Sequence, residues 1–587
     1  MLQRFGNHQV DRDWLNRNFP CMMACPAGTG AGRYVALIAE GRLEEAYRYA
    51  CDANPLSSIC GRVCAHPCEA ACRRGVIDKP IQIRALERVL TERYGPESLS
   101  PLTVHERSAA GQPFRIAVVG SGPMGLSVAR DLALLGYPVT IFEAAPVAGG
   151  MLRLGIPEYR LPRSVTEAQI REILAAGDIT LRLNQAAGRD FTISGLRYQG
   201  FAAVVLAVGA HRGQELFIPG ANLAGVHKGI DFLRGASLGA CFPIGRKVVI
   251  VGGGNVAIDT ARTALRMGSE ILILYRRERK DMPAIEEEAE AAEQEGAKIM
   301  FMASPRRIIG DAEGKVIAIE VSGSNTESRI DCDTIITAIG QMPNLDFLEA
   351  EPDIQVSRQG LIMVDGATLM TSVPGIFAGG DCVFGPRLII DAVGDGKRIA
   401  RSVDEYLTGR LHPDPDVIVE VLDHRKIRQP SRAIPLGQRA GITGVEADLH
   451  ERAAMAEARR CLRCWINTSF GGNHDDGPRC ILCGACVDVC PEECLRLAPL
   501  DHIDFPTPVL DQILENRRLF RVELNDVAAE ELGVITGSVM LKDETRCIRC
   551  GLCAERCPVG EIAMEAYYLA PRETVVSVQA RSIPDGD

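Results

Sequence analysis

Two runs of cysteines near the end of the 587-residue chain share one spacing. In each run four cysteines follow the pattern C-x2-C-x2-C-x3-C, and a proline comes directly after the last. The first run holds Cys480, Cys483, Cys486 and Cys490, and the second holds Cys547, Cys550, Cys553 and Cys557. Such short spacing lets three thiolates of one loop bind three corners of a [4Fe–4S] cubane. Zinc needs four ligands and does not call for two Cys-Pro endings, so the pattern predicts two [4Fe–4S] clusters.

The repetition also predicts which cysteines share a cluster, and it resembles the two-cluster ferredoxins of bacteria. In such repeats the fourth cysteine of one run binds the cluster of the other run. One cluster is therefore expected on Cys480, Cys483, Cys486 and Cys557, and the other on Cys547, Cys550, Cys553 and Cys490. Cys494 is expected to be spare. The 56 residues between the two runs exceed what a compact module needs, and they are either a docking surface or a long loop.

A glycine-rich turn in the middle of the chain has the features of a dinucleotide site. An apolar strand over 116–119 runs into Gly120, Gly122, Pro123 and Gly125, and a helical stretch over 126–135 follows. A second strand over 139–142 ends in Glu143. Such glycines let the backbone approach a pyrophosphate, and the acid can accept hydrogen bonds from ribose hydroxyls. The strand, turn, helix and acid together predict a βαβ dinucleotide-binding unit.

A second copy of this unit begins at residue 247. Its turn contains Gly252, Gly254 and Asn255, and its next strand, over 271–274, leads to Arg276 and Arg277. Where the first unit has an acid, the second has two guanidinium groups, which suit the 2′-phosphate of NADP(H). The alternative is a solvated surface turn. We therefore expect a preference for NADP(H) over NAD(H).

The flavin is expected at the first of the two units. An apolar strand from residue 375 ends in Gly380 and Asp381, and in two-dinucleotide flavoproteins such a strand returns to the FAD domain, where its Asp contacts the cofactor. The segments 207–209 and 338–340 resemble the crossings between the two domains. Paired in this way, the domains present the nicotinamide to the flavin for hydride transfer. The middle of the chain holds only isolated cysteines, which counts against a disulfide reductase.

Residues 20–410 resemble the small subunit of NADPH-dependent glutamate synthase and its relatives. These relatives include NADH-dependent ferredoxin:NADP oxidoreductase and the electron-input half of dihydropyrimidine dehydrogenase. The motifs that carry the resemblance lie at 20–26, 60–72, 149–162, 275–277, 282–284 and 380–381. The resemblance implies that Gly150 and Arg160 touch FAD, and that Arg276 and Arg277 hold the 2′-phosphate.

The resemblance further implies one or two [4Fe–4S] clusters in a helical N-terminal domain. The first would use Cys25, Cys64 and Cys68 with Glu87 as the fourth ligand, and Cys60 is the alternative fourth ligand. The second would use Cys21 and Cys72 together with an upstream Arg-Cys-Leu-x-Cys segment, which this chain lacks.

The segment 460–464, which contains Cys461 and Cys464, matches the missing Arg-Cys-Leu-x-Cys segment but lies far downstream. We hypothesise that it folds back and completes the cluster of Cys21 and Cys72; otherwise its cysteines are idle or bind zinc. With the fold-back, fifteen cysteines and Glu87 supply sixteen ligands, enough for four cubanes.

Composition excludes several classes of protein. The formal net charge is −11 and the pI is near 5.6, whereas a general nucleic-acid binder is expected to be basic. No apolar run reaches the ~18 residues that span a bilayer. Residues 1–18 have no apolar core of a signal peptide, so we expect a cytoplasmic protein in which the 21 cysteines serve metals rather than disulfides.

The expected fold class is α/β, a flavoprotein with two dinucleotide-binding domains for FAD and NADPH. An α-helical iron–sulfur domain precedes them, and an α+β ferredoxin-like domain follows. The expected boundaries are 1–110 for the helical domain, 111–242 with 375–410 for the FAD domain, 243–374 for the NADPH domain, 411–470 for a linker and 471–587 for the ferredoxin domain.

The expected function is that of an NAD(P)H:ferredoxin-type oxidoreductase or an electron-transfer subunit of a larger redox complex. Its partner would be a ferredoxin or a catalytic subunit, such as that of a 2-oxoacid:ferredoxin oxidoreductase or a glutamate synthase large subunit. A flavin-based electron-bifurcating enzyme and a non-catalytic scaffold that only connects clusters are the alternatives. Intact glycine turns and the arginine pair argue against the scaffold.

Overall fold

The computed structural model describes residues 15–16, 18–99, 101–102, 112–240, 243–323, 327–412, 417–422, 447–470, 480, 482–499, 538–543 and 546–569. Most of the expected insertion between the two cysteine runs lies outside these residues. The chain divides into two compact units. The first contains Met1–Ala53, His66–Leu90 and Pro413–Glu573, and the second Asn54–Ala65, Thr91–His412 and Thr574–Asp587. Among the described residues, no helix combines the length and apolar character needed to cross a membrane.

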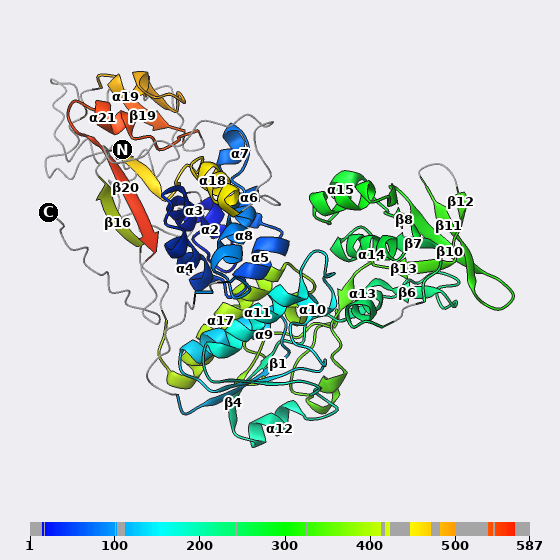
Figure 1. The fold of residues 1–587 in the computed structure, drawn as a ribbon. Coiled ribbons are helices and arrows are strands. Elements are labelled where there is room, and N and C mark those ends of the chain that lie inside the picture. The colour runs from blue at the N-terminus through cyan, green and yellow to red at the C-terminus, as the bar shows by residue number, and fades with distance from the viewer. Residues whose placement is uncertain are drawn as a thin grey trace, which may run out of the picture. The chain divides into compact units, whose positions relative to one another are not determined.

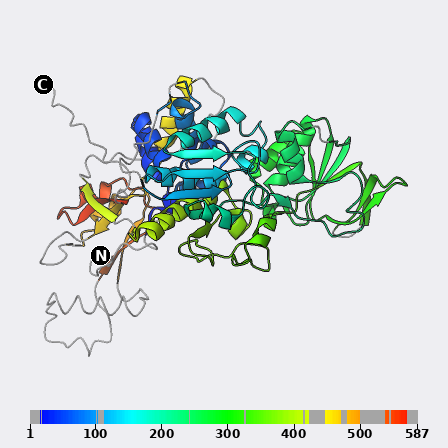
Figure 2. The ribbon, with the colours of Figure 1, turned by 90° about the horizontal axis from the view of Figure 1, so that it is seen from below.

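The second unit contains a five-stranded parallel sheet with the order β15-β4-β1-β2-β3. Its strands are β1 (Arg115–Val119), β2 (Val139–Phe142), β3 (Ile179–Arg182), β4 (Phe201–Leu206) and β15 (Ile376–Ala378). β15 comes from much later in the chain and pairs with β4. It therefore belongs to the same sheet as β1, the strand that leads into the first glycine turn. Helices α9 (Pro123–Leu134) and α17 (Ile389–Thr408) pack together, and Figure 2 shows strands of this sheet side by side.

The shorter helices of this part of the unit connect the strands or flank them. They are α5 (Ser57–Val63), α10 (Met151–Leu154), α11 (Arg163–Ala175), α12 (Ile193–Tyr198) and α16 (Asp381–Phe384), with a 3-10 helix η2 at Asp346–Ala350. Because parallel strands are covered on both faces, they consist of nearly uninterrupted apolar residues. In β1 the four residues after Arg115 are all buried.

A second parallel sheet in the same unit has the order β6-β13-β7-β8-β9. Its strands are β6 (Val226–Lys228), β7 (Lys247–Val251), β8 (Glu270–Leu274), β9 (Lys298–Met300) and β13 (Thr334–Thr337). Helices α13 (Gly229–Ser237), α14 (Asn255–Arg266) and α15 (Glu286–Gln294) accompany it and are labelled in Figure 1. The 3-10 helix η1 (Arg279–Asp281) also accompanies it. The antiparallel strands β10 (Ser304–Gly310), β11 (Val316–Ser322) and β12 (Glu327–Asp331) form a separate sheet.

Two short strands connect the two parallel sheets. β5 (Arg212–Gly213) pairs with β14 (Gln341–Met342) in antiparallel orientation. Each follows one of the segments that were expected to cross between the domains, 207–209 and 338–340. β6 already belongs to the second sheet, so this sheet begins before residue 243, the start expected for the NADPH domain.

The first unit begins with short helices, and three of them contain one cysteine each, Cys21, Cys51 and Cys68. The helices are α2 (Pro20–Met23), α3 (Ala31–Ala39), α4 (Leu43–Ala53), α6 (Pro67–Ala70), α7 (Arg74–Ile77) and α8 (Ile83–Tyr94). Helix α18 (Ala447–Ala458), from far down the chain, packs on α3. The N-terminal helices therefore share a unit with residues that precede the ferredoxin-like part directly.

The ferredoxin-like part of this unit is built on two antiparallel sheets. β16 (Val417–Leu422), β20 (Ile562–Leu569) and β17 (Ile466–Phe470) form the first, and β18 (Leu495–Pro499) and β19 (Ser538–Lys542) form the second. Helices α19 (Ala485–Asp488) and α21 (Leu552–Arg556) lie within the two cysteine runs and contain the third cysteine of each, Cys486 and Cys553. β16 and β17 lie within 411–470, so the stretch expected to be a linker contributes two strands.

Candidate functional site

The first glycine turn leaves an open space at the start of α9. Gly120 has φ 110°, and a Cβ there would lie 2.3 Å from the carbonyl oxygen of Ala207. A Cβ on Gly125 would lie 2.0 Å from the carbonyl oxygen of Gly120, so neither position admits a side chain. At Gly122, by contrast, no atom lies within 4 Å of the Cβ position, and α9 begins there at Pro123 without a side-chain cap. The turn fits a pyrophosphate placed against backbone N–H groups.

Glu143 organises this turn from the end of β2. Its carboxylate accepts hydrogen bonds from the Ser121 backbone N–H at 2.9 Å, from the Ser121 hydroxyl at 2.6 Å and from the Ala145 N–H at 2.8 Å. The Ser121 hydroxyl in turn accepts from the N–H of Gly149 at 3.0 Å. The expected contact of Glu143 with a ribose stays a prediction, since two carboxylate oxygens can accept further bonds.

The second glycine turn repeats the geometry of the first. Gly252 has φ 141°, and its Cβ would lie 2.2 Å from the carbonyl oxygen of Ala338. Gly254 again faces open space, and α14 begins directly after it without a side-chain cap at that glycine. Asn255 accepts a hydrogen bond from the N–H of Ile285 at 3.0 Å. Both turns therefore provide an unobstructed helix N-terminus, as a second pyrophosphate requires.

The arginine pair follows β8 at the surface. Arg276 and Arg277 are exposed, and neither has an ion-pair partner in the described part of the chain. Tyr275, directly before them, is buried against Gly253, where a Cβ would lie 2.4 Å from its ring. The ring anchors the end of the strand and leaves both guanidinium groups available, which fits recognition of a phosphate dianion.

Gly150, Gly380 and Asp381 gather at the first turn. Gly150 has φ 52°, and its Cβ would lie 2.8 Å from the Cα of Gly122. A Cβ on Gly380 would lie 3.5 Å from the sulfur of Met124 in α9. Asp381 begins α16 and accepts from the N–H of Arg387 at 3.1 Å, and burial raises its pKa to about 6. The structure thus brings together the residues expected to contact FAD, except Arg160.

Arg160 contacts carboxylates of the other dinucleotide-binding part. Its Nη1 donates to both oxygens of Asp259, at 2.8 and 2.7 Å, and its Nε lies 3.1 Å from a carboxylate oxygen of Glu288. Its expected contact with FAD stays a prediction. Asp259 was not singled out in the sequence, although a carboxylate within the mostly apolar stretch 256–261 is unusual in a helix that packs on a sheet.

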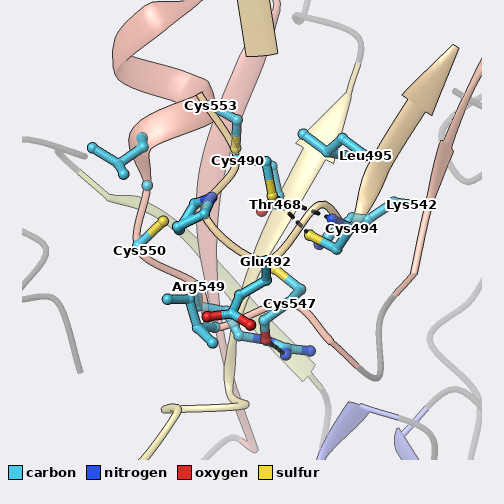
Figure 3. Close-up of a pocket in the computed structure, with 14 residues that line it drawn as sticks. Thr468, Cys490, Glu492, Cys494, Leu495, Lys542, Cys547, Arg549, Cys550 and Cys553 are labelled. Carbon is cyan, nitrogen blue, oxygen red and sulfur yellow. Dashed lines mark hydrogen bonds between the residues drawn. The ribbon is translucent and has the colours of Figure 1, made fainter. Parts of the chain in front are cut away.

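One pocket in the ferredoxin-like part is lined by a complete predicted ligand set (Figure 3). Its wall includes Cys547, Cys550 and Cys553 of the second run together with Cys490 of the first. The pairing of three cysteines from one run with the fourth of the other is the arrangement expected for a [4Fe–4S] cluster. Cys494, expected to be spare, also lines the pocket, with its sulfur 3.3 Å from that of Cys490.

The other predicted set is less enclosed. Burial raises the pKa of Cys486, and so do the nearby thiols of Cys480 and Cys483. The sulfur of Cys557 accepts from the N–H of Glu561 at 3.3 Å and packs beside the same apolar core as Cys486. These positions fit the ligand set, and ligation itself stays a prediction.

Three Cys-x-x-Cys loops share a backbone conformation that side chains rarely adopt. The second intervening residue is in the left-handed region in each, with φ 54° at Leu482, 54° at Arg549 and 51° at Arg463. In the loop 461–464, the Arg463 N–H also points at the Cys461 sulfur, at 3.4 Å. The two ferredoxin loops and the downstream segment thus share a left-handed residue directly before their second cysteine.

The downstream segment lies beside the N-terminal cysteines, as the fold-back hypothesis expects. Burial raises the pKa of Cys21, and so do the adjacent thiols of Cys464, Cys461 and Cys72. Burial and the thiol of Cys464 raise the pKa of Cys461 to about 12, with Cys72 a further cause. The structure therefore places all four predicted ligands near one another, and their sharing of a cluster stays a prediction.

Arg460 holds this segment in place. Its side chain is completely buried, and it donates to Asp78 at 2.8 Å and to the carbonyl oxygen of Lys79 at 2.7 Å. Its own carbonyl oxygen accepts from Arg74 at 3.1 Å. Glu457, an ion-pair partner of Arg460, also accepts from the N–H of Gln82 at 3.1 Å.

The remaining N-terminal set is only partly assembled within one unit. Burial raises the pKa of the Tyr34 hydroxyl, and the adjacent Glu87, Cys68 and Cys25 raise it further. Glu87 is buried, as a non-cysteine ligand beside these thiols would be. Cys64 follows α5 in the other unit, so the four-residue set stays a prediction.

Comparison with known families matches each part of the chain separately. The pyridine nucleotide-disulphide oxidoreductase family matches residues 114–396. The 4Fe-4S cluster domain II of dihydropyrimidine dehydrogenase matches residues 7–97, and the 4Fe-4S dicluster domain matches residues 479–561. These matches cover both glycine turns, the N-terminal cysteines and both C-terminal runs.

Individual relatives share most of this arrangement. The beta subunit of an NADP(+)-dependent formate dehydrogenase from Moorella thermoacetica is 38% identical over 76% of this chain and 70% of its own length. The NADPH-Fe(3+) oxidoreductase subunit beta of Geobacter sulfurreducens is 34% identical over 76% and 75%. The small chain of the glutamate synthase [NADPH] of Azospirillum brasilense is 30% identical over 68% and 89%.

The fold, the two glycine turns, the cysteine loops and the relatives all indicate the same class of enzyme. The chain is an NAD(P)H-dependent oxidoreductase that uses FAD and [4Fe–4S] clusters. It belongs to the family of iron–sulfur flavoproteins related to the small chain of glutamate synthase, with a two-cluster ferredoxin module at its C-terminal end.

Proposed function

We propose that the chain is the electron-input subunit of a larger redox complex, with NADPH as its hydride donor and four [4Fe–4S] clusters as its electron path. Bound FAD would accept hydride from NADPH and release the two electrons singly to the clusters. The residues of the chain bind and orient these groups: the glycine turns hold the two pyrophosphates, and the cysteine loops hold the clusters.

The observation that carries this proposal is the continuity of the stretch 461–470. Its first four residues approach the N-terminal cysteines, and its last five form β17, which pairs with β20. Trp465, between them, accepts a hydrogen bond from the N–H of Tyr567 at 2.9 Å, and its ring lies 3.2 Å from the Cβ position of Gly32. One short stretch therefore connects the predicted N-terminal cluster to the ferredoxin sheet.

The partner is inferred from the relatives and from the ferredoxin module. The relatives are beta subunits and a small chain, which are parts of larger enzymes. A second cluster-binding module is of use to a partner that exchanges single electrons. We infer a hetero-oligomer with a catalytic subunit that oxidises or reduces a low-potential substrate, such as formate or a 2-oxoacid.

Coenzyme preference is tested by replacing the arginine pair. In the double variant Arg276→Ala/Arg277→Ala we expect the KM for NADPH to rise about 10- to 100-fold, because two charge-assisted hydrogen-bonding groups are lost. The KM for NADH should change little. Anaerobic viologen reduction measures both, and Arg246→Ala, an exposed arginine paired with Glu270, is the matched control. An equal loss with NADH would refute a role at the 2′-phosphate.

The place in a complex is tested by anaerobic purification of the tagged chain from its native host. A catalytic subunit recovered in equal amount, with NADPH reducing its active centre, supports the proposal and identifies the substrate. An active chain that purifies alone and reduces free ferredoxin would instead make it a free-standing NADPH:ferredoxin reductase.

A further inference from the structure

The segment 155–162 connects the two dinucleotide-binding parts of the second unit through side chains. It lies between α10 and α11 and turns back on itself, since the N–H groups of Arg160 and Leu161 both donate to the carbonyl oxygen of Pro157 at 3.1 Å. Leu161 is completely buried, and α11, which follows the turn directly, packs on α9 and β3 of the part that carries the FAD site. Tyr159 and Arg160 extend from this turn to α14 and α15.

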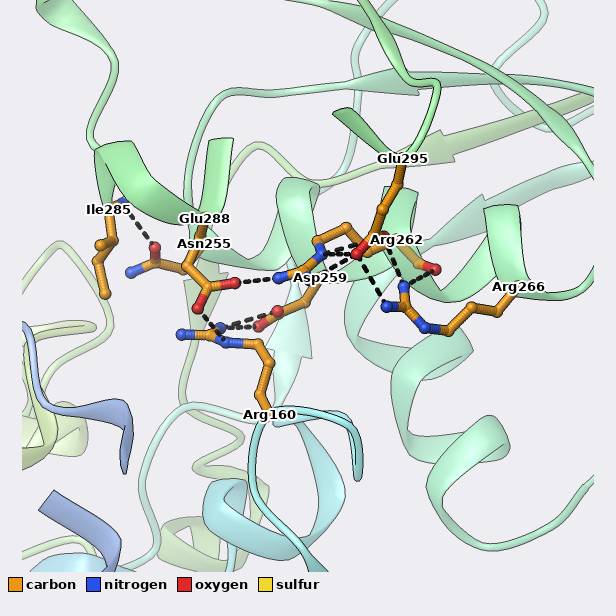
Figure 4. A network of polar contacts seen from close by, with 8 residues as sticks. All are labelled: Arg160, Asn255, Asp259, Arg262, Arg266, Ile285, Glu288 and Glu295. Atoms are coloured by element: carbon orange, nitrogen blue, oxygen red, sulfur yellow. Dashed lines mark hydrogen bonds and ion pairs between the residues drawn. The ribbon is translucent and has the colours of Figure 1, made fainter. Parts of the chain in front are cut away.

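Arg160 forms a buried ion pair with Asp259 of α14 (Figure 4). The side chains are only 8% and 6% exposed, and both carboxylate oxygens accept from the same guanidinium nitrogen. Glu288 of α15 lies 3.1 Å from the Nε of Arg160 and also pairs with Arg262 of α14. One arginine is thus held by carboxylates from two helices that accompany the second sheet.

The ring of Tyr159 contacts α14 one and two turns after Asp259, at Arg262 and Arg266. Its ring centroid lies 4.8 Å from the guanidinium carbon of Arg262 and 3.8 Å from that of Arg266. Both arginines are fixed from the other side by Glu295, which accepts from each at 2.7 Å. Positions 259, 262 and 266 lie on one face of α14, because they are spaced three and four residues apart.

Such a contact determines geometry more than stability. Burying two charges costs much of what their attraction returns, so a buried ion pair is a weak source of stability, and removing one partner leaves the other charge uncompensated. A charge-assisted contact in which one guanidinium nitrogen donates to both oxygens of a buried carboxylate nevertheless depends closely on angle and distance. The pair therefore selects one position of α14 against the segment 155–162.

The position of α14 matters for the reaction, because this helix begins at the nucleotide-binding turn. Gly254 and Asn255 form its N-terminus, and Asp259 follows about one turn later. Hydride transfer requires donor and acceptor atoms about 3–3.5 Å apart, and a misplacement of about 1 Å can slow a reaction about a hundredfold. A rigid helix transmits any shift at Asp259 to the bound nucleotide.

We propose that Arg160 and Asp259 are positioning residues for hydride transfer, forming a latch that sets the NADPH-binding helix against the part of the chain that carries FAD. Neither residue needs to touch the reacting atoms for this role. The latch acts before any electron reaches a cluster, so the proposal does not depend on the acceptor or on the partner.

Stopped-flow reduction of the bound flavin by NADPH tests the latch in the full-length holoenzyme under anaerobic conditions. For Asp259→Asn we expect the limiting rate of flavin reduction to fall about tenfold or more, while FAD content and the Kd for NADPH stay within about threefold. Asp259→Glu should recover much of the rate. An unchanged limiting rate in Asp259→Asn would overturn the proposal.

Asp131 provides the matched control. It is a carboxylate on α9 whose partners, Lys397 at 3.1 Å and Arg130 at 3.0 Å, belong to the same part as the FAD site. Asp131→Asn removes a comparable ion pair without loosening the contact between the two parts. Its limiting rate should stay within about twofold of the wild type, and a loss equal to that of Asp259→Asn would show a general effect of lost ion pairs.

A double-mutant cycle separates a shared latch from two independent roles. If Arg160→Gln and Asp259→Asn break the same contact, the double variant should be no slower than the slower single variant. Effects that multiply would mean that the residues act separately, and the latch would be wrong. If Asp259→Asn fails to retain FAD, the limiting rate of Arg160→Gln decides: a fall of about tenfold with FAD retained supports the latch, and an unchanged rate overturns it.

Discussion

The loops 461–464 and 547–550 share a left-handed residue but differ in where the other predicted cluster ligands come from. Both hold the second intervening residue at positive φ, 51° at Arg463 and 54° at Arg549. The C-terminal loop finds its third cysteine three residues later, at Cys553, within its own run. The loop 461–464 has no such neighbour in sequence and lies beside cysteines from the opposite end of the chain.

The difference shows that loop geometry and cluster completion are separate problems. A Cys-x-x-Cys loop needs only four residues to adopt its shape. Completion of the predicted cluster of Cys21 and Cys72 also needs the contacts of α18 and Arg460 with the N-terminal part of the chain. The entropy of closing a long loop grows only with the logarithm of its length, so a few specific contacts are enough to hold the ends together. Buried Arg460 supplies the most specific of these contacts.

The largest effect is expected from removing the two thiols of the loop 461–464. The double variant Cys461→Ser/Cys464→Ser should lose the iron of one [4Fe–4S] cluster per chain, because a site with two of four thiolates does not retain a cubane. The electron paramagnetic resonance signals of the ferredoxin clusters should persist. Cys547→Ser/Cys550→Ser is the matched variant, and it should lose a ferredoxin cluster instead. Unchanged iron in the first variant would contradict the fold-back.

Arg460→Met should detach the loop 461–464 from the N-terminal helices without changing a thiol. The variant leaves the carboxylate of Glu457 without its buried ion-pair partner and removes one of the two arginines that contact Asp78, at a cost of about 3–5 kcal/mol. We expect iron loss like that of the cysteine variant, together with faster hydrogen exchange in α18. Arg460→Lys keeps the charge and should lose less. Full iron content in Arg460→Met would show that the attachment rests on other contacts.

Acid should weaken the contact between the loop 461–464 and the N-terminal helices. Burial by itself would raise the pKa of Asp78, but hydrogen bonds from Arg74 and the charge of Arg460 lower it well below its usual value of 3.8. A lowered pKa in the folded state contributes stability that is complete above the unfolded value and is lost as the pH falls below it. The protection factor of α18 against hydrogen exchange should fall below about pH 4, and Asp78→Asn should remove that dependence on pH.

The smallest effect tests the shared loop conformation. Leu482 is 44% exposed and has φ 54°, which costs a residue with a side chain about 1–2 kcal/mol. Leu482→Gly relieves this strain but makes the unfolded chain more flexible, so the expected net gain is about 0.5 kcal/mol. Thermal loss of cluster absorbance measures it, with Leu482→Ala as the control that keeps a Cβ. A loss of stability in the glycine variant would contradict the left-handed conformation.

Much of the dinucleotide chemistry was predictable, because its pattern is local. The glycines at 120 and 252 are required where the turn meets a carbonyl oxygen, and each turn, strand and helix lies within about thirty residues. The spacing also predicts the crossover of Cys490 to the second run. Cys490 lines one pocket with cysteines of that run, and their binding of one cluster stays a prediction.

Other features were hidden because they depend on distant pairing. β6 has three residues, too few for a clear pattern, and it joins the second sheet only through β13. β16 and β17 gain their strand character from β20, about a hundred residues or more along the chain, so the stretch 411–470 had the composition of a linker. Arg160 was expected at the flavin, and nothing nearby in sequence indicated Asp259 as its partner.

The sequence by itself determined the cofactors of this protein, because a phosphate turn or a cubane loop is specified by residue types a few positions apart. The tertiary structure alone decided which loops meet and how the nucleotide-binding helix is held. Those contacts join residues hundreds of positions apart, as at Arg460 and Asp78, or in the two different dinucleotide-binding parts, as at Arg160 and Asp259. Their energy depends on burial and on the angle between two side chains, and neither exists until the chain has folded.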